Sequence, residues 1–142
     1  MSLKITRADV WAMDVRNRPG MLARILEALA TAGADLEFVV ARRVTENTSR
    51  VFVAPLKGAK QLRAAADVGL QRAAGMHCVR VSGPDRPGAG ARLTRALAAA
   101  DLNLRGVSNA AIGSKFLCYF AFATADDADT ARKVLKRAAT AR

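Results

Sequence analysis

Two short stretches of this chain combine a polar side chain, a proline and a glycine where a helix is expected to begin. They read Asn17-Arg18-Pro19-Gly20-Met21 and Asp85-Arg86-Pro87-Gly88-Ala89. Backbone N–H groups at a helix start lack intrahelical partners and favour a carboxylate. We expect such groups at Gly20, Met21, Gly88 and Ala89. The side chains of Asn17 and Asp85 can accept a hydrogen bond from an ammonium group, so each stretch suits a free amino acid. The same residue types also form an ordinary strand-to-helix turn.

Residues for other kinds of chemistry are scarce. His77 is the single histidine, and it directly precedes Cys78. Adjacent residues of a strand point to opposite faces, so these two cannot act together as base and nucleophile. The chain also lacks a glycine-rich phosphate loop, metal-ligand spacing and a serine nucleophile motif. We therefore expect neither catalysis nor a metal or other cofactor.

Charge is the most unusual feature of the composition. The 142 residues carry 23 Lys and Arg against 12 Asp and Glu, a net charge of +11. Residues 1–74 contribute +5 and residues 75–142 contribute +6, with no block of Lys or Arg. Such scatter favours a solvated basic surface over a nucleic-acid site.

The location of the chain follows from what its sequence lacks. It contains no run of about eighteen apolar residues and no apolar centre of a signal peptide, so we expect a cytoplasmic protein without a membrane span. Cys78 and Cys118 lie in apolar, strand-like runs, where free thiols behave as small buried hydrophobes.

Hydrophobic periodicity predicts an alternation of strands and helices. The expected elements of the first half are strand 9–15, helix 19–32, strand 35–43, strand 50–56, a helix from Ala59 to Val68 and a short strand 70–73. Pro19 is expected at the first helical position, with Asn17 near the cap and Gly33 at the left-handed C-terminal end.

The second half repeats this order. Its expected elements are strand 77–83, helix 87–100, strands 103–111 and 115–123, and a final helix capped by Thr124. No fourth strand follows, so we expect a neighbouring copy or chain to cover that sheet edge. The first and third strands should be adjacent, which would make Cys78 and Cys118 neighbours.

An internal duplication explains the repeated order. Residues 17–39 and 85–107 align without a gap and are identical at eleven of 23 positions. Residues 1–74 and 75–142 are therefore predicted as two tandem repeats of the α+β class. Right-handed crossovers give each a ferredoxin-like βαββαβ fold, an antiparallel sheet in the order 4-1-3-2 with its helices on one face.

The stretches "NRPGMLARILEALATAGADLE" and "DRPGAGARLTRALAAADLNLR" resemble the opening of ACT domains, the small-molecule regulatory modules of amino-acid metabolism. In that family, an amino acid binds to the first loop and the start of the second strand where two copies meet. The resemblance implies ligand-binding roles for Asn17, Gly20, Met21 and Asp35 in one copy and for Asp85, Gly88, Ala89 and Asn103 in the other. We expect the ligand ammonium near Asn17 and Asp35, or near Asp85 and Asn103, with the second copy preferred.

The resemblance implies a stand-alone regulatory module with an amino-acid ligand, a homodimeric assembly and a target enzyme or regulator as partner. Two alternatives remain. The chain could act as a regulatory subunit through protein contacts alone, or as a ferredoxin-like nucleic-acid-binding protein. The latter reads bases on exposed aromatic side chains, whereas Phe116, Tyr119, Phe120 and Phe122 alternate poorly and are more typical of a core.

Overall fold

The computed structural model describes residues 3–140 and divides the chain into two compact units. One unit, called here the contiguous unit, is Asp9–Ala74. The other, called here the composite unit, joins the segment after Ala74 to the N-terminal segment that ends at Ala8. The outer ends of the expected repeats, residues 1–2 and 141–142, lie outside the described residues.

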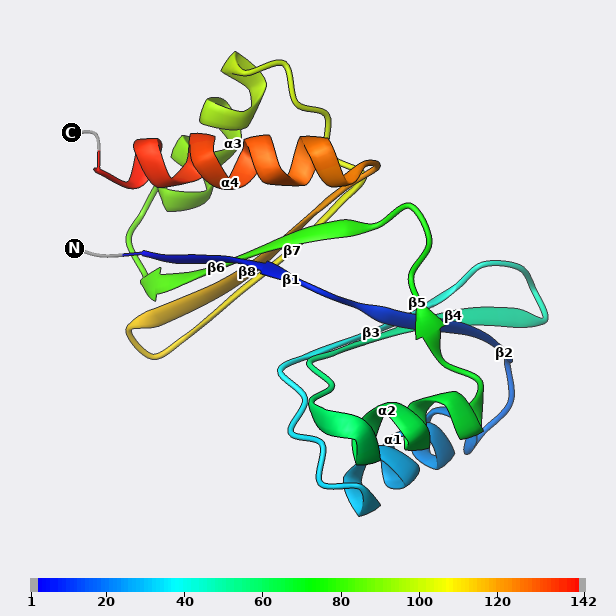
Figure 1. Cartoon of the computed structure of the whole chain (residues 1–142). Helices are drawn as coiled ribbons and strands as arrows, with labels where there is room; N and C mark the ends of the chain where they lie inside the picture. The colour runs from blue at the N-terminus through cyan, green and yellow to red at the C-terminus, as the bar shows by residue number, and fades with distance from the viewer. Residues whose placement is uncertain (1–2, 141–142) are drawn as a thin grey trace. The chain divides into compact units, whose positions relative to one another are not determined.

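The contiguous unit has the predicted order of elements (Figure 1). They are β2 (Trp11–Arg16), α1 (Met21–Thr31), β3 (Phe38–Arg43), β4 (Thr48–Ala54), α2 (Gly58–Val68) and β5 (Gln71–Arg72). The antiparallel sheet has the order β3-β4-β2-β5, and both helices cover one face. Ile25 and Leu29 of α1 pack there against Val51 and Val53 of the sheet.

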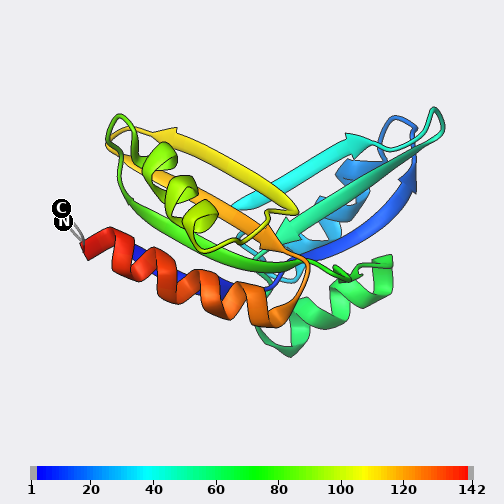
Figure 2. The same ribbon diagram turned by 90° about the horizontal axis from the view of Figure 1, so that it is seen from above.

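The composite unit has the same architecture with a different origin for one strand. Its elements are β1 (Lys4–Ala8), β6 (His77–Pro84), α3 (Ala89–Ala99), β7 (Gly106–Ile112), β8 (Lys115–Phe122) and α4 (Ala125–Thr140). The sheet order is β1-β6-β8-β7, with α3 and α4 on one face (Figure 2). Leu93 and Leu97 of α3 pack in one core with Phe120 and Phe122. The expected equivalence of the helices at 19–32 and 87–100 is confirmed.

Strand β1 corrects the prediction that the second repeat lacks a fourth strand. It pairs antiparallel with β6, Ile5 opposite Val81, so a segment assigned by sequence to the first repeat completes the second sheet. The side chain of Ile5 enters the core, and Arg7 forms an ion pair of 2.6 Å with Asp129 of α4. The strand escaped prediction because it offers a single buried apolar residue, too few to show a period of two.

The helix ends confirm some of the predicted caps and contradict others. Helix α1 begins at Met21, two residues after Pro19, and no side chain caps it. Gly33 does end it in the left-handed region, at φ 85°, and its N–H donates to the Ala30 carbonyl at 2.9 Å. At α4, the Asp127 N–H donates to the Thr124 hydroxyl at 3.1 Å, as expected for a cap.

The two cysteines lie on adjacent strands but are not neighbours, which corrects that expectation. Cys78 is paired with Ala121, and Cys118 with Val81, so the two thiols face opposite sides of the sheet. Both are free and buried. Cys118 belongs to the core beneath the helices, where burial raises the pKa of its thiol to about 12. That side chain therefore stays protonated and acts as a small hydrophobe.

Candidate functional site

Each Arg-Pro-Gly stretch forms a tight turn between the first strand and first helix of its unit. The Met21 N–H donates to the Arg18 carbonyl at 3.4 Å, and the Ala89 N–H to the Arg86 carbonyl at 3.1 Å. Gly20 has φ 90° and ψ −11°, and Gly88 has φ 85° and ψ 0°. Proline followed by glycine with these angles is a type II turn, which requires the left-handed conformation at its third residue.

The turns change the expectation for the backbone donors. The N–H groups of Met21 and Ala89 are used inside the turn, so the prediction that they are unpaired is wrong. The space next to the two glycines is nevertheless open. A Cβ built on Gly20 or Gly88 would meet no atom within 4 Å, so a ligand can approach either backbone closely.

A backbone hydrogen bond joins the residue before each turn to the tip of the hairpin that follows in the same unit. The Asn17 N–H donates to the Asn47 carbonyl at 2.8 Å, and the Asp85 N–H donates to the Ser114 carbonyl at the same distance. Asn17 and Asp85 are thus equivalent in hydrogen bonding as well as in sequence. Their exposed side chains are presented at the same place in each unit.

The side chains at this equivalent position have different partners. With the Asn17 amide oxygen turned toward Arg43, it accepts from Nη2 at 2.8 Å and from Nε at 3.0 Å. The strand registers place Ala111 where the contiguous unit has Arg43. Within residues 3–140, the carboxylate of Asp85 has no hydrogen-bond or ion-pair partner. Asp85 is therefore the acceptor that remains available to a ligand.

Asp35 and Asn103 lie far from these turns within their own units. Asp35 precedes β3, whose first residue is paired with Ala54, whereas Asn17 follows β2, whose last residue is paired with Thr48. Six residues of β4 separate these ends, about 20 Å at the rise of a strand. Asp85 and Asn103 are separated in the same way along β8. The expected contact of both polar residues with one ligand does not form within a single repeat.

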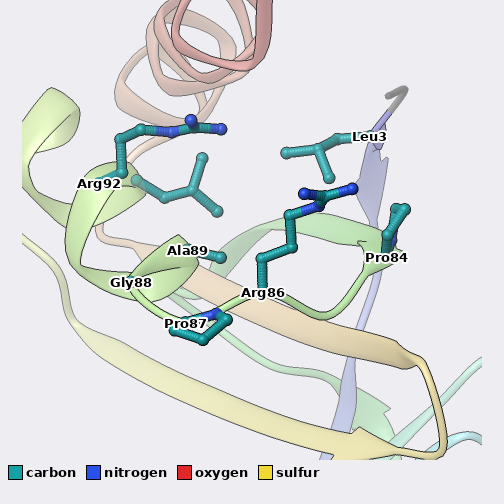
Figure 3. Close-up of a pocket in the computed structure, with 8 residues that line it drawn as sticks. Leu3, Pro84, Arg86, Pro87, Gly88, Ala89 and Arg92 are labelled. Carbon is teal, nitrogen blue, oxygen red and sulfur yellow. The ribbon is translucent and has the colours of Figure 1, made fainter. Parts of the chain in front are cut away.

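A pocket of about 190 Å³ lies at the Gly88 turn (Figure 3). Its lining residues are Leu3, Pro84, Arg86, Pro87, Gly88, Ala89, Arg92 and Leu93. Arg86 comes from the turn and Arg92 from the first turn of α3, while Leu3 stands across the opening. The lining contains two guanidinium groups and no carboxylate.

Sequence reasoning missed Arg86, Arg92 and Leu3 as site residues. The two arginines carried a usable signal, because Arg18 and Arg24 occupy the same positions 68 residues earlier. Leu3 carried none, since its place beside the turn depends on the pairing of β1 with β6.

Because β1 belongs to the composite unit, the distribution of charge between the two units also differs from that between the two sequence repeats. Counted over the sequence, residues 9–74 hold 10 basic and 7 acidic side chains, whereas residues 1–8 and 75–142 hold 13 and 5. The contiguous unit thus has a net charge of +3 and the composite unit +8. The charge that looked even along the chain is concentrated in the unit that holds the pocket, where it favours anionic ligands.

Other kinds of site find little support among the described residues. Phe116, Phe120 and Phe122 are buried in the core beneath the helices and cannot stack with bases. Residues 3–140 contain no group of three or more His, Cys, Asp or Glu side chains that could hold a metal ion. In the same range, no helix is both long and apolar enough to cross a membrane.

Comparison with known proteins agrees with this fold. The sequence model of the ACT domain matches residues 12–68. No curated protein sequence matches the chain. Among solved structures, protein BT0572 from Bacteroides thetaiotaomicron is similar with a TM-score of 0.79 at 18% identity, covering 94% of this chain and 89% of that one.

Two further similar structures come from aspartate kinases. The ligand-free regulatory subunit from Thermus thermophilus has a TM-score of 0.63 at 17% identity, covering 96% of this chain and 95% of that one. E. coli aspartokinase III in complex with lysine and aspartate has a TM-score of 0.55 at 14% identity, covering 97% of this chain and 32% of that one. At these identities, the likenesses show that the tandem fold is shared.

Proposed function

Since residues 12–68 form an ACT domain and the chain carries two ferredoxin-like repeats, we propose that it is a non-catalytic regulatory module that binds a free amino acid. The regulatory subunits and domains of aspartate kinases among its structural neighbours support a regulatory role. The proposed place of action is the cytoplasm.

The observation that carries this proposal is the pair of type II turns. Each turn follows the first strand, starts its helix, holds a glycine with open space in front of it and presents an Asn or Asp side chain. An exposed polar acceptor beside an accessible helix start offers partners for both the ammonium and the carboxylate of an amino acid. The proposed site residues are Asn17, Gly20, Asp85 and Gly88, with Met21 and Ala89 contributing position rather than donors.

Asp35 and Asn103 can contribute only if a ligand lies between two copies. They are about 20 Å from the turns of their own units, so the turn of one repeat would have to meet the strand start of another repeat. We therefore propose a homodimer. The outer strands β3 and β7 support it, because each ends its sheet with an exposed valine, Val39 or Val107, and such edges recruit further strands.

The test is a thermal-shift screen of the full chain against the twenty amino acids. A ligand that binds only the folded state raises the melting temperature, and the rise grows with the logarithm of the ligand concentration above its Kd. We expect one amino acid or a related pair to do so. If none shifts the melting temperature, the amino-acid function falls and regulation through protein contacts alone takes its place. Light scattering tests the dimer, and a 15.1 kDa species at all concentrations would contradict it.

A further inference from the structure

We propose that the pocket at Gly88 selects an acidic ligand, a dicarboxylic amino acid bound through Arg86 and Arg92. This inference rests on the proposed amino-acid function and names the chemical class of its ligand.

The charge of the lining carries the inference. Arg86 extends from the Gly88 turn and Arg92 from the first turn of α3 toward the same pocket, and no acidic residue lines it (Figure 3). Within residues 3–140, the guanidinium of Arg92 has no hydrogen-bond or ion-pair partner. A guanidinium binds a carboxylate through two parallel hydrogen bonds, and two guanidinium groups match two carboxylates.

The remaining walls suit the short carbon chain of such a ligand. Leu3 and Leu93 line the pocket together with Pro84 and Pro87. These side chains can cover one or two methylene groups without leaving a polar atom unpaired. A basic amino acid would instead place its side-chain ammonium beside two guanidinium groups, which repel it.

Asp85 does not line the pocket, but it lies between two residues that do, Pro84 and Arg86, and is the partner that this proposal assigns to the ligand ammonium. It directly precedes Arg86, its N–H is fixed by the Ser114 carbonyl, and its carboxylate has no partner within residues 3–140. A diacid that lacks an ammonium group, such as succinate, should therefore bind more weakly than aspartate or glutamate.

The contiguous unit contains the same arginines without the same enclosure. Arg18 and Arg24 are the equivalents of Arg86 and Arg92. Its closing strand β5 pairs only with Trp11 and Ala12, at the end of β2 opposite the turn. Strand β1 instead reaches Ser82, near the Gly88 turn, and brings Leu3 to the opening. The wall made by Leu3 is thus specific to the composite unit.

The experiment is calorimetry of the full chain with L-aspartate, L-glutamate, L-asparagine, L-lysine, succinate and inorganic phosphate. We expect aspartate or glutamate to bind best. The variant Arg92→Gln should lose an ion-paired hydrogen bond and weaken that binding roughly ten- to a hundredfold. Arg24→Gln is the matched control, the same change at the equivalent position, and should leave the affinity unchanged. Both variants should keep the wild-type circular dichroism spectrum, because both side chains are exposed.

The outcomes separate this inference from the proposed function. If asparagine or lysine binds at least as well as the acidic amino acids, the inference is overturned while the amino-acid function stands. If succinate or phosphate matches aspartate, the site recognises anions alone and the inference falls. Equal losses in Arg92→Gln and Arg24→Gln would also overturn it. If no amino acid binds, both the function and the inference fail.

Discussion

The two units have the same turn, the same first helix and the same sheet order, yet they close their sheets with different strands. The contiguous unit uses β5, two residues long, which follows α2 directly. The composite unit uses β1, five residues long, which lies at the other end of the chain. The sequence repeats, 1–74 and 75–142, therefore do not coincide with the folded units, because the segment that ends at Ala8 belongs to the composite unit. Accordingly, the ACT family match covers 12–68, inside the contiguous unit.

The same difference extends to the turns. In the contiguous unit, Asn17 is already paired with Arg43, and the closing strand stops far from the turn. In the composite unit, Asp85 lacks such a partner within residues 3–140, and Leu3 encloses the approach to Gly88. The structural order of the repeats is preserved while the surfaces at their turns, which we propose as ligand sites, diverge.

Deletion of residues 1–8 should have the largest effect on this comparison. It removes the fourth strand and the buried Ile5 from the composite unit, at a cost of at least about 3 kcal/mol in the free energy of unfolding. Hydrogen exchange should become faster in β6 and remain slow in β4. As a control, residues 1–8 attached behind Arg142 through a glycine linker should restore protection, because a ferredoxin-like fold places this strand after its last helix. Unchanged exchange in β6 would show that β1 contributes nothing.

Two equivalent leucines measure whether the cores are equally well packed. Leu29 is 0% exposed and Leu97 is 1% exposed, each on the first helix of its unit. Leu29→Ala and Leu97→Ala should each cost about 2–5 kcal/mol, since truncation leaves a cavity in a packed core. Urea denaturation followed by circular dichroism provides the measurement. Costs that differ by more than about twofold would mean that the two cores are not energetically equivalent.

An exchange of one residue tests the different partners of the two turns. Ala111→Arg places an arginine at the position equivalent to Arg43 and should give Asp85 an ion pair worth less than about 1 kcal/mol. The same variant should weaken ligand binding at the Gly88 pocket, because Asp85 would no longer be available. Arg43→Ala is its counterpart in the contiguous unit and should leave that binding unchanged. If calorimetry finds the same ligand affinity for Ala111→Arg as for the wild type, Asp85 is not part of the site.

The smallest expected effect concerns pH and again distinguishes the units. In the contiguous unit, Arg50 Nε donates to Asp14 at 2.7 Å, and this hydrogen bond holds the pKa of the carboxyl below its usual value of 3.8. A lowered folded pKa gives stabilisation that is present above pH 3.8 and is lost as the pH falls through the folded value. The composite unit has Ser82 and Leu117 at these positions. Arg50→Gln should therefore reduce the loss of stability between pH 3.8 and lower pH in the contiguous unit alone. Hydrogen exchange, measured separately for the two units, provides the test.

The sequence predicted most of the fold because its periodicity is strong on the helices. Ile25 and Leu29, with their equivalents Leu93 and Leu97, mark the buried faces that locate α1 and α3. The predicted start of each helix lies two residues too early, because proline favours the first helical position and the prediction follows that preference. A proline followed by glycine also signals a type II turn, and the left-handed Gly20 decides in favour of that turn.

The candidate site was less predictable, for geometric reasons. Asn17 and Asp35 looked like partners in sequence, but a crossover helix joins parallel strands. The end of the first strand and the start of the next then lie at opposite ends of the sheet. The enclosure of the Gly88 pocket depends on Leu3, whose position follows from a strand pairing across 78 residues, Lys4 with Ser82. Local pattern contains no information about such a pairing.

The placement of β1 also has a consequence during synthesis. The ribosome makes β1 before the contiguous unit, yet its partner β6 follows only after the whole of that unit has been made. At typical elongation rates the strand waits on the order of 4–15 seconds, long enough for Asp9–Ala74 to fold alone. Throughout that delay β1 lacks the strand with which it pairs. Its charged residues Lys4 and Arg7 then act as gatekeepers that discourage aggregation until β6 emerges.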